Sequence, residues 1–310
     1  MENNVQNDTQ YDDEIDLREL FGVLWAGSRK IIAITAVFAF VSVIYALSVP
    51  NQYKAITLLA PAQSDSSDLT EALGQMGGLA SLAGVSVGSE SSEAKTAQEI
   101  MQSWSFIEGF IAENNIAVEV YAAQEWSRGS NELQINDDLY DTETKTWLVE
   151  NNNTGEAGPP SSWKLFKSFS GRIEVSEDKI SGLVSVSIEY YSPQIAKQCL
   201  DMYVAAINAH MQQRQMERVT NNINYLQAQI EKTSIAEMRE VFYNIIEEQT
   251  KNKMLAEASP DYVFVTVSPS MVPEEKSQPQ RALICILGTL LGGMLSVLLV
   301  LVMHYARKSD

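Results

Sequence analysis

The chain has little of the chemistry on which most enzymes depend, with two cysteines and two histidines in 310 residues. Cys285 lies in an apolar run and Cys199 in a polar region, so the two cannot pair within one chain and imply no disulfide framework. No histidine pair or cysteine cluster has metal-ligand spacing, and no G-x-x-x-x-G-K-[ST] sequence is present to cradle phosphates. We therefore expect no metal, no cofactor and no nucleotide hydrolysis.

Positive charge is also scarce, because 22 Lys and Arg face 40 Asp and Glu and leave a formal net charge of −18. Residues 50–281 alone hold 32 acidic and 17 basic side chains, a net charge of −15. A nucleic-acid binder must neutralise phosphates with Lys and Arg, so this composition argues against one. It equally disfavours docking of this region on anionic lipid.

Two long apolar runs without charge, residues 31–49 and 282–303, lie near the two ends of the chain. At a rise of about 1.5 Å per residue, the 22 residues of the second run span a hydrocarbon core of about 30 Å. Ala46, Leu47 and Ser48 also form a small-x-small cleavage pattern. However, the 30 residues before the first run are long and acidic for a signal peptide, so a retained anchor is favoured.

The second run contains Gly288 and Gly292 four residues apart, with Gly293 beside them. Such spacing leaves one helix face bare enough for another helix to approach, although glycines are also simply tolerated in spans. The run is preceded by a proline-rich linker with Pro269, Pro273, Pro279 and Arg281, and these prolines stiffen the chain before the membrane.

These features predict five segments: a cytoplasmic tail with an amphipathic segment (1–30), a first span (31–49), a domain outside the cytoplasm (50–281), a second span (282–303) and a cytoplasmic tail (304–310). Arg29 and Lys30 before the first span and Arg307 and Lys308 after the second favour cytoplasmic termini. Ile15, Leu17, Leu20, Phe21 and Leu24 recur at near-helical spacing. They form an amphipathic helix at the inner leaflet or simply begin the first span.

The central region predicts an α+β domain, a mixed sheet base with a long helical hairpin, anchored by two transmembrane helices. Strands are expected at 53–60, 173–175, 183–190 and 262–268, the middle two as an antiparallel hairpin. Helices are expected at 93–111, at 162–168 with Ser161 as cap, and from Pro193 to about Ile230. Residues 116–160 read as irregular.

The long helix carries an apolar stripe at alternating spacings of three and four: Met216, Val219, Ile223, Leu226 and Ile230. Such a stripe is the seam of a helix packed lengthwise on another. The pattern breaks after Ile230, and Ser234 with Glu237 predicts a capping box for a return helix that ends near Ala258.

Residues 63–92 are rich in glycine and small apolar residues, which argues against a rigid element. Gly77, Gly78 and Gly84 lie in this stretch, where Leu79 and Leu82 are three residues apart, so part of it could be a loose apolar helix that needs a partner surface. The stretch also contains Ser86 in a G-x-S-x-G pattern, but no strand precedes it, and no base or oxyanion site supports a membrane-bound hydrolase. The aromatics Trp126, Tyr140 and Trp147 could stack on sugar rings, but packing within the domain is the favoured reading.

Several motifs together resemble the Wzz chain-length determinants, polysaccharide co-polymerases of the Gram-negative inner membrane. Residues 14–20 (EIDLREL) followed by Leu24 and Trp25 resemble the family's lead into its first span, and Pro50 with Tyr53 its exit. Residues 77–84 (GGLASLAG) and 254–258 (MLAEA) resemble further family segments. The most specific likeness is Pro273, Pro279 and Arg281 followed by Gly288 and Gly292, although residues 276–279 depart from the usual linker.

The resemblance implies a non-enzymatic regulator of the modal length of O-antigen. It implies a two-pass inner-membrane protein with a periplasmic bell, a homo-oligomeric ring commonly taken as an octamer, and partnership with the Wzy polymerase and its glycan. For this chain we expect Met216–Ile230 to pack between protomers, and Gly288 and Gly292 to pack on the polymerase or on a neighbouring span. We expect the segment with Gly77, Gly78, Leu79, Leu82 and Gly84 to line the interior of the ring near the growing glycan. The alternative is a membrane adaptor for capsule or exopolysaccharide export. That alternative needs a kinase domain or a docking tail beyond residue 304.

Overall fold

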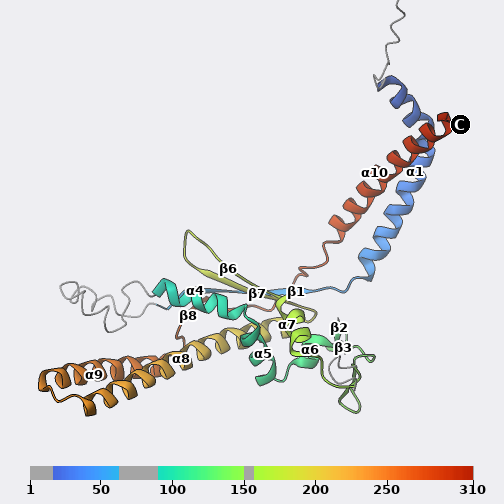
Figure 1. Ribbon diagram of the computed structural model, residues 1–310. Coiled ribbons are helices and arrows are strands. Elements are labelled where there is room, and N and C mark those ends of the chain that lie inside the picture. Colours follow the sequence, from blue (N-terminus) through green and yellow to red (C-terminus); the bar gives the residue numbers. More distant parts are fainter. Residues whose placement is uncertain (1–16, 63–89, 150–156, 310) are drawn as a thin grey trace, which may run out of the picture. The chain divides into compact units, whose positions relative to one another are not determined.

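A computed structural model describes residues 17–62, 90–149 and 157–309 of the chain. They divide into two compact units, one formed by residues 51–277 and the other by the segments up to Pro50 and from Gln278 onward. The first unit is an α+β domain, and the second is a pair of long apolar helices (Figure 1).

A four-stranded sheet forms the base of the α+β domain, in the spatial order β6 (Ile173–Glu177), β7 (Val184–Tyr190), β1 (Tyr53–Pro61) and β8 (Phe264–Ser268). All three pairings are antiparallel. The α+β class is confirmed, but the expectation of a mixed sheet is wrong. A parallel pair needs its two strands side by side, and here β1 lies between β7 and β8, both of which run opposite to it.

The alternation in β7 decides which face of the sheet is covered. Val184, Val186, Ile188 and Tyr190 are all buried, as the sequence pattern predicts. Their partners Leu59, Thr57 and Ala55 on β1 are buried on the same face. The predicted antiparallel hairpin of β6 and β7 is confirmed, with Gly182 at a φ of +69° in its turn.

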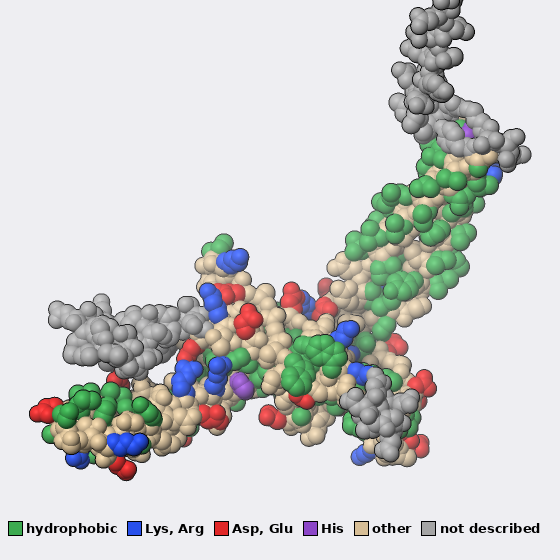
Figure 2. Space-filling view, viewed as in Figure 1, with side chains coloured by type: hydrophobic (Ala, Val, Ile, Leu, Met, Phe, Trp, Pro, Cys, Tyr) green, Lys and Arg blue, Asp and Glu red, His purple; other side chains and the backbone are tan. Residues whose placement is uncertain are grey.

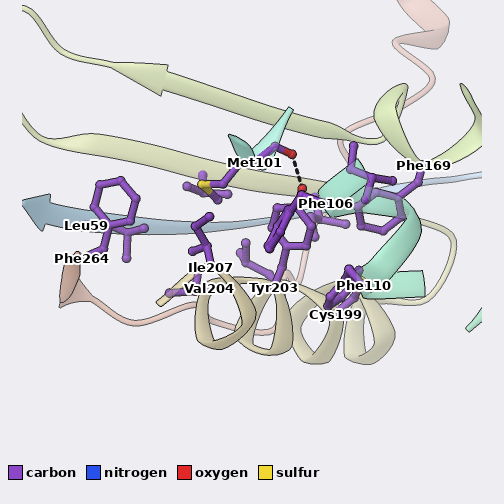
Figure 3. Packing of buried hydrophobic residues seen from close by; sticks show 14 of the residues in the cluster. Leu59, Met101, Phe106, Phe110, Phe169, Cys199, Tyr203, Val204, Ile207 and Phe264 are labelled. Atoms are coloured by element: carbon purple, nitrogen blue, oxygen red, sulfur yellow. Dashed lines mark hydrogen bonds between the residues drawn. The ribbon is translucent and has the colours of Figure 1, made fainter. Parts of the chain in front are cut away.

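The core lies between this face of the sheet and helix α8 (Pro193–Lys232) (Figure 3). Tyr203 of α8 is fully buried, and its ring is surrounded by Phe106, Phe110 and Phe169 at centroid distances of 5.3, 4.8 and 5.5 Å. Its hydroxyl donates to the carbonyl oxygen of Met101. A buried tyrosine needs such an acceptor, so this bond fixes α8 against the end of helix α4.

Helix α4 (Glu90–Met101) and helix α5 (Trp104–Glu113) replace the single helix expected at 93–111. The hydroxyl of Ser103 accepts a hydrogen bond from the backbone N–H of Phe106 at 3.4 Å and begins α5. The apolar spacing continues across this cap, so periodicity alone did not reveal the break. Helix α7 (Ser162–Ser170) begins at its predicted cap, Ser161.

The region expected to be irregular contains short elements where it is described. A short helix α6 (Ala117–Tyr121) is followed by the hairpin of β2 (Ala123–Ser127) and β3 (Glu132–Ile135) and by the two-residue strands β4 (Tyr140–Asp141) and β5 (Thr146–Trp147). Asn131 and Lys145 turn these hairpins with φ values of 56° and 54°. Strands this short do not show enough alternation to be read from sequence.

The predicted helical hairpin is confirmed. Helix α8 ends at Lys232, and helix α9 (Ala236–Ala258) returns along it (Figure 1). The side-chain amide of Gln212 donates to the carbonyl oxygens of Ala256 and Ser259 at 2.8 and 3.1 Å, which ties the end of α9 to α8. The capping box is wrong, because the N-cap is Ile235 and no side chain caps the helix.

The second unit consists of α1 (Leu17–Ser48) and α10 (Arg281–Ser309). Both are long and apolar enough to cross a membrane, over Gly22–Ser48 and Arg281–His304. Apolar side chains cover most of their surface (Figure 2). Because α1 is continuous from Leu17, the described part of the N-terminal apolar pattern begins the first span instead of forming a separate helix. Ile15 lies outside the described residues.

Candidate functional surfaces

Gly288 and Gly292 lie against α1 of the same chain. A Cβ atom on Gly288 would come within 2.5 Å of the Cβ atom of Ser42, and one on Gly292 within 2.4 Å of the Cβ atom of Phe38. Contacts this short mean that any side chain at either position would push the helices apart. Gly293 differs, because a Cβ atom there would meet nothing within 4 Å.

The same seam continues along the two helices with small and polar residues. Gly27 faces the side chain of Val300, where an added Cβ atom would lie 2.5 Å from Cγ1. Thr35 and Ser296 place their hydroxyl oxygens 3.3 Å apart, and Ser296 is fully buried. At the other end, Nε of Arg281 donates to the carbonyl oxygen of Ala46 at 3.1 Å. The spans of one chain are therefore closely packed along much of their length.

Sequence reasoning did not identify the α1 side of this seam. The signal was present, since Gly27, Thr35, Ser42 and Ala46 recur at intervals of eight, seven and four residues and share one helix face. The close contact of Gly27 with Val300 also brings the start of α1 and the end of α10 to the same end of the pair. Both basic pairs, at residues 29–30 and 307–308, belong to that end.

The proline-rich linker is attached to the α+β domain along its first part. Ser270 lies between Pro269 and Pro273. Its hydroxyl is buried and donates to the carboxylate of Asp201 on α8. Farther along, the backbone N–H of Ser277 donates to the carbonyl oxygen of Gln52 at 2.8 Å. Pro279 is buried within the helix unit and follows a cis peptide bond.

The predicted oligomer seam packs at least partly within the chain. Val219 and Ile230 are 1% and 8% exposed, and the other stripe residues Met216, Ile223 and Leu226 are half-buried on the helix that packs along α9. A role between protomers stays a prediction. The apolar residues of the hairpin that are exposed are different ones: Tyr225, Ile235, Met238, Val241, Tyr243, Met254 and Leu255.

Two other groups of predicted site residues have different outcomes. Gly77, Gly78, Leu79, Leu82 and Gly84, together with Ser86, lie outside the described residues, so their predicted roles stay predictions. Among the aromatics, Trp126 packs edge-on against Tyr53 at 5.8 Å, and Trp147 packs against Tyr140 at 5.0 Å. These contacts fit the packing reading.

A cluster of one arginine and two tyrosines also lies beside the core. The guanidinium of Arg172 lies over the rings of Tyr190 and Tyr191 at 4.9 and 5.0 Å. Burial raises the pKa of Tyr190 well above its usual range, while the nearby Arg172 acts in the opposite direction. Burial likewise raises the pKa of the Cys199 thiol to about 12. A thiol with so high a pKa stays protonated and is a packing residue, not a nucleophile.

The described residues contain no group of three or more His, Cys, Asp or Glu side chains that could hold a metal ion. His210, on the surface of α8, packs edge-on against Phe106 at 5.4 Å. The candidate surfaces for packing and docking are the glycine seam of the helix pair, the hairpin of α8 and α9, and the outer faces of the base.

Comparison with known proteins gives a consistent result. The model of the Wzz family, described as chain length determinant protein, matches residues 13–114, from the first apolar helix through α5. A solved structure named as a full-length bacterial polysaccharide co-polymerase has 15% sequence identity and a TM-score of 0.42. The match covers 95% of this chain and 99% of that one.

A fragment of WzzB, a polysaccharide co-polymerase from Salmonella Typhimurium, has 13% identity and a TM-score of 0.31 over 74% of this chain and all of that one. With both TM-scores below 0.5, the fold rests on the sheet and helix packing described above. No curated protein matches the chain. None of these matches has the name of an enzyme. The family model thus confirms the resemblance to the Wzz chain length determinant proteins over residues 13–114.

Proposed function

We propose that the protein sets the length of O-antigen polysaccharide as a non-enzymatic co-polymerase that acts with the Wzy polymerase. The observation that carries the proposal is the family match over residues 13–114, which joins a membrane helix to the first strand of the base. The two apolar helices fit an inner-membrane protein. Both basic pairs lie at one end of the helix pair, which supports cytoplasmic termini and a periplasmic α+β domain.

We further propose that copies of the chain assemble into a ring, commonly octameric in the family, through the hairpin of α8 and α9. Seven large apolar side chains are exposed on this hairpin, and Val241, Tyr243 and Met254 are each more than half exposed. Apolar patches of this kind mark interaction surfaces. The stripe at Met216–Ile230 would then position α9, and the exposed residues of α9 would meet the neighbour.

We propose that α10 contacts the polymerase through its face at Gly293, which does not face α1. Gly288 and Gly292 contact Ser42 and Phe38, whereas an added Cβ atom on Gly293 would meet nothing within 4 Å. Changing Gly293 to Leu should broaden the O-antigen distribution while the protein stays in the membrane. Unchanged banding would remove this role.

The test of the main proposal is a lipopolysaccharide gel from cells with and without the protein, in a background that otherwise makes complete O-antigen. We expect deletion to replace a modal ladder with a broad distribution and complementation to restore it. If the ladder is unchanged while capsule or exopolysaccharide is lost, the protein is instead an export adaptor.

A further inference from the structure

Two exposed tryptophans lie at the starts of helices α5 and α7. Trp104 is 47% exposed and Trp163 is 63% exposed. The two are linked through Ser162, because Nε1 of Trp104 donates to the hydroxyl of this neighbour of Trp163 at 2.9 Å. Phe166 extends the surface, with its ring 5.3 Å from that of Trp163 at an angle of 37°. We call Trp104, Trp163 and Phe166 the tryptophan platform.

The platform is built rather than incidental. Ser103 caps α5 directly before Trp104, and Ser161 caps α7 two residues before Trp163. The two caps fix where the first turns of these helices begin. The opposite faces of the same helices are anchored in the core by Phe106, Phe110 and Phe169, all less than 8% exposed. The rings are thus held by rigid elements, and Figure 2 shows hydrophobic side chains gathered over α7.

The direction of the Trp104 ring indicates what the platform binds. A tryptophan at a membrane surface keeps its body in the apolar layer and turns its N–H toward the wet headgroups. In Trp104 the N–H is bound to Ser162 within the protein, so the exposed part of the side chain is its apolar surface. The negative face of an aromatic ring attracts the partly positive C–H groups of a pyranose, and neighbouring hydroxyls such as that of the exposed Ser105 can bond sugar hydroxyls.

Charge points the same way. Residues 50–281 have a net charge of −15, which repels anionic lipid and gives no advantage to an anionic ligand. The lysines of α7, Lys164 and Lys167, are only two cations in that surrounding field. An uncharged ligand that binds by stacking is not affected by either sign.

We infer that the tryptophan platform is a glycan-binding site that stacks neutral sugar rings of the polysaccharide. This inference rests on the proposed function for the origin of the glycan and assigns the contact to Trp104 and Trp163. Sequence reasoning had considered Trp126, Tyr140 and Trp147 for this role, but those rings are half-buried, whereas Trp104 and Trp163 are exposed.

The test is equilibrium dialysis of the full-length protein in nanodiscs against labelled O-polysaccharide released by mild acid from cells that express the protein. We expect the Trp104→Ala/Trp163→Ala double variant to weaken binding at least tenfold. Trp163→Phe retains a ring face and should bind within about threefold of the unchanged protein. If only the size of the side chain mattered, this smaller ring would weaken binding as well. Ile180→Ser, which changes an apolar side chain that is 98% exposed on the β6–β7 turn, is the matched control and should have no effect.

Failure to bind by the unchanged protein, or equal binding by the double variant, would overturn the inference. So would brominated-lipid quenching of tryptophan fluorescence that is greater in the unchanged protein than in the double variant, because the difference would assign the platform to the membrane surface. The lipopolysaccharide gel keeps the two proposals apart. A modal ladder that depends on the protein, together with no polysaccharide binding, rejects the platform and leaves chain-length control intact.

Discussion

Asn208 is a polar residue buried between α8 and the start of β8, with 3% of its surface exposed. Its side-chain oxygen accepts from the backbone N–H groups of Val263 and Phe264 at 3.1 and 2.9 Å, and its nitrogen donates to the carbonyl oxygen of Phe264 at 2.9 Å. One amide thus satisfies three backbone groups where the last strand enters the sheet. Nothing in the apolar pattern of α8 marks this residue, because its role depends on a strand 55 residues later.

Changing Asn208 to Ala should lower the free energy of unfolding by about 3 kcal/mol, because it leaves two buried donors and one buried acceptor without partners. Asn208→Asp keeps the acceptor and loses the donor. The exposed Asn222→Ala on the same helix is the control and should change little. Thermal unfolding of the purified full-length protein measures all three. An Ala variant that melts like the control would contradict this role.

The contact between Gly288 and Ser42 can be tested by enlarging the side chain on one helix and shortening the facing side chain on the other. Gly288→Ala alone should separate the helices and lower the melting temperature in detergent, since its Cβ atom would lie 2.5 Å from that of Ser42. Adding Ser42→Gly removes the opposing atom and should restore most of the loss. Gly293→Ala, which meets open space, is the control. If Ser42→Gly gives no rescue, the glycine face meets something other than α1.

Stability should fall in alkaline solution, beginning with Cys199. The native pKa of this thiol is raised to about 12 from an ordinary value of 9.0, so its stabilising effect is complete below pH 9 and is lost as the pH rises toward 12. Each pH unit in this window costs about 1.4 kcal/mol per group. The buried Tyr203, whose pKa is also raised by burial, adds to the loss above pH 10. Urea midpoints from pH 8 to 11 measure the slope.

The matched variant for this prediction is Cys199→Ala. Without the thiol, the decline should begin nearer pH 10, where tyrosines of the unfolded chain start to ionise. An unchanged onset would mean that Cys199 is not the group involved.

At the scale of the elements, the long helices and the capped helix α7 were predictable, whereas the break between α4 and α5 and the shortest strands were not. The apolar spacing of α8 and the break after Ile230 predicted the hairpin, because several residues over many turns contribute to one pattern. The break at Ser103 rests on a single hydroxyl. The strands at 140–141 and 146–147 exist through one pairing each and through turns such as that at Lys145. Local sequence cannot show such pairings, since they depend on where the partner folds.

The hairpin offers two valines in opposite environments for a matched comparison. Val219 is 1% exposed, so Val219→Asp buries a charge beside α9 and should destabilise the hairpin by about 3 kcal/mol or more. Val241 is 54% exposed, so Val241→Asp should leave the fold intact and weaken assembly of copies. Hydrogen exchange over α8 and α9 reports the first effect, and light scattering after size-exclusion chromatography reports the second. Full assembly of Val241→Asp would remove this face from the proposed interface.

For the whole molecule, the sequence predicted two spans and a substantial domain between them, and this division stays a prediction; by packing, the chain divides at residues 50 and 278. The packing of the two apolar helices against each other was harder to predict from the sequence. It depends on which face of α1 meets the glycines, and several faces of an apolar helix look alike in sequence.

Orientation in the membrane can be tested with new cysteines, because the native Cys199 is buried and has a raised pKa. Ile180, on the β6–β7 turn, is 98% exposed. In a Cys285→Ser background, Ile180→Cys should react with an impermeant maleimide in intact cells. Asp310→Cys should react only after lysis. The reverse pattern would place the α+β domain in the cytoplasm.

The sealed glycine seam has a consequence for the order of assembly. Because α1 and α10 belong to one chain, their contact forms at an effective concentration set by the intervening domain and is independent of how many copies are present. A newly inserted chain can complete this contact before it meets a second copy. Slow synthesis or dilution in the membrane would then delay only the contacts between chains. Single copies would already have their helix pair formed.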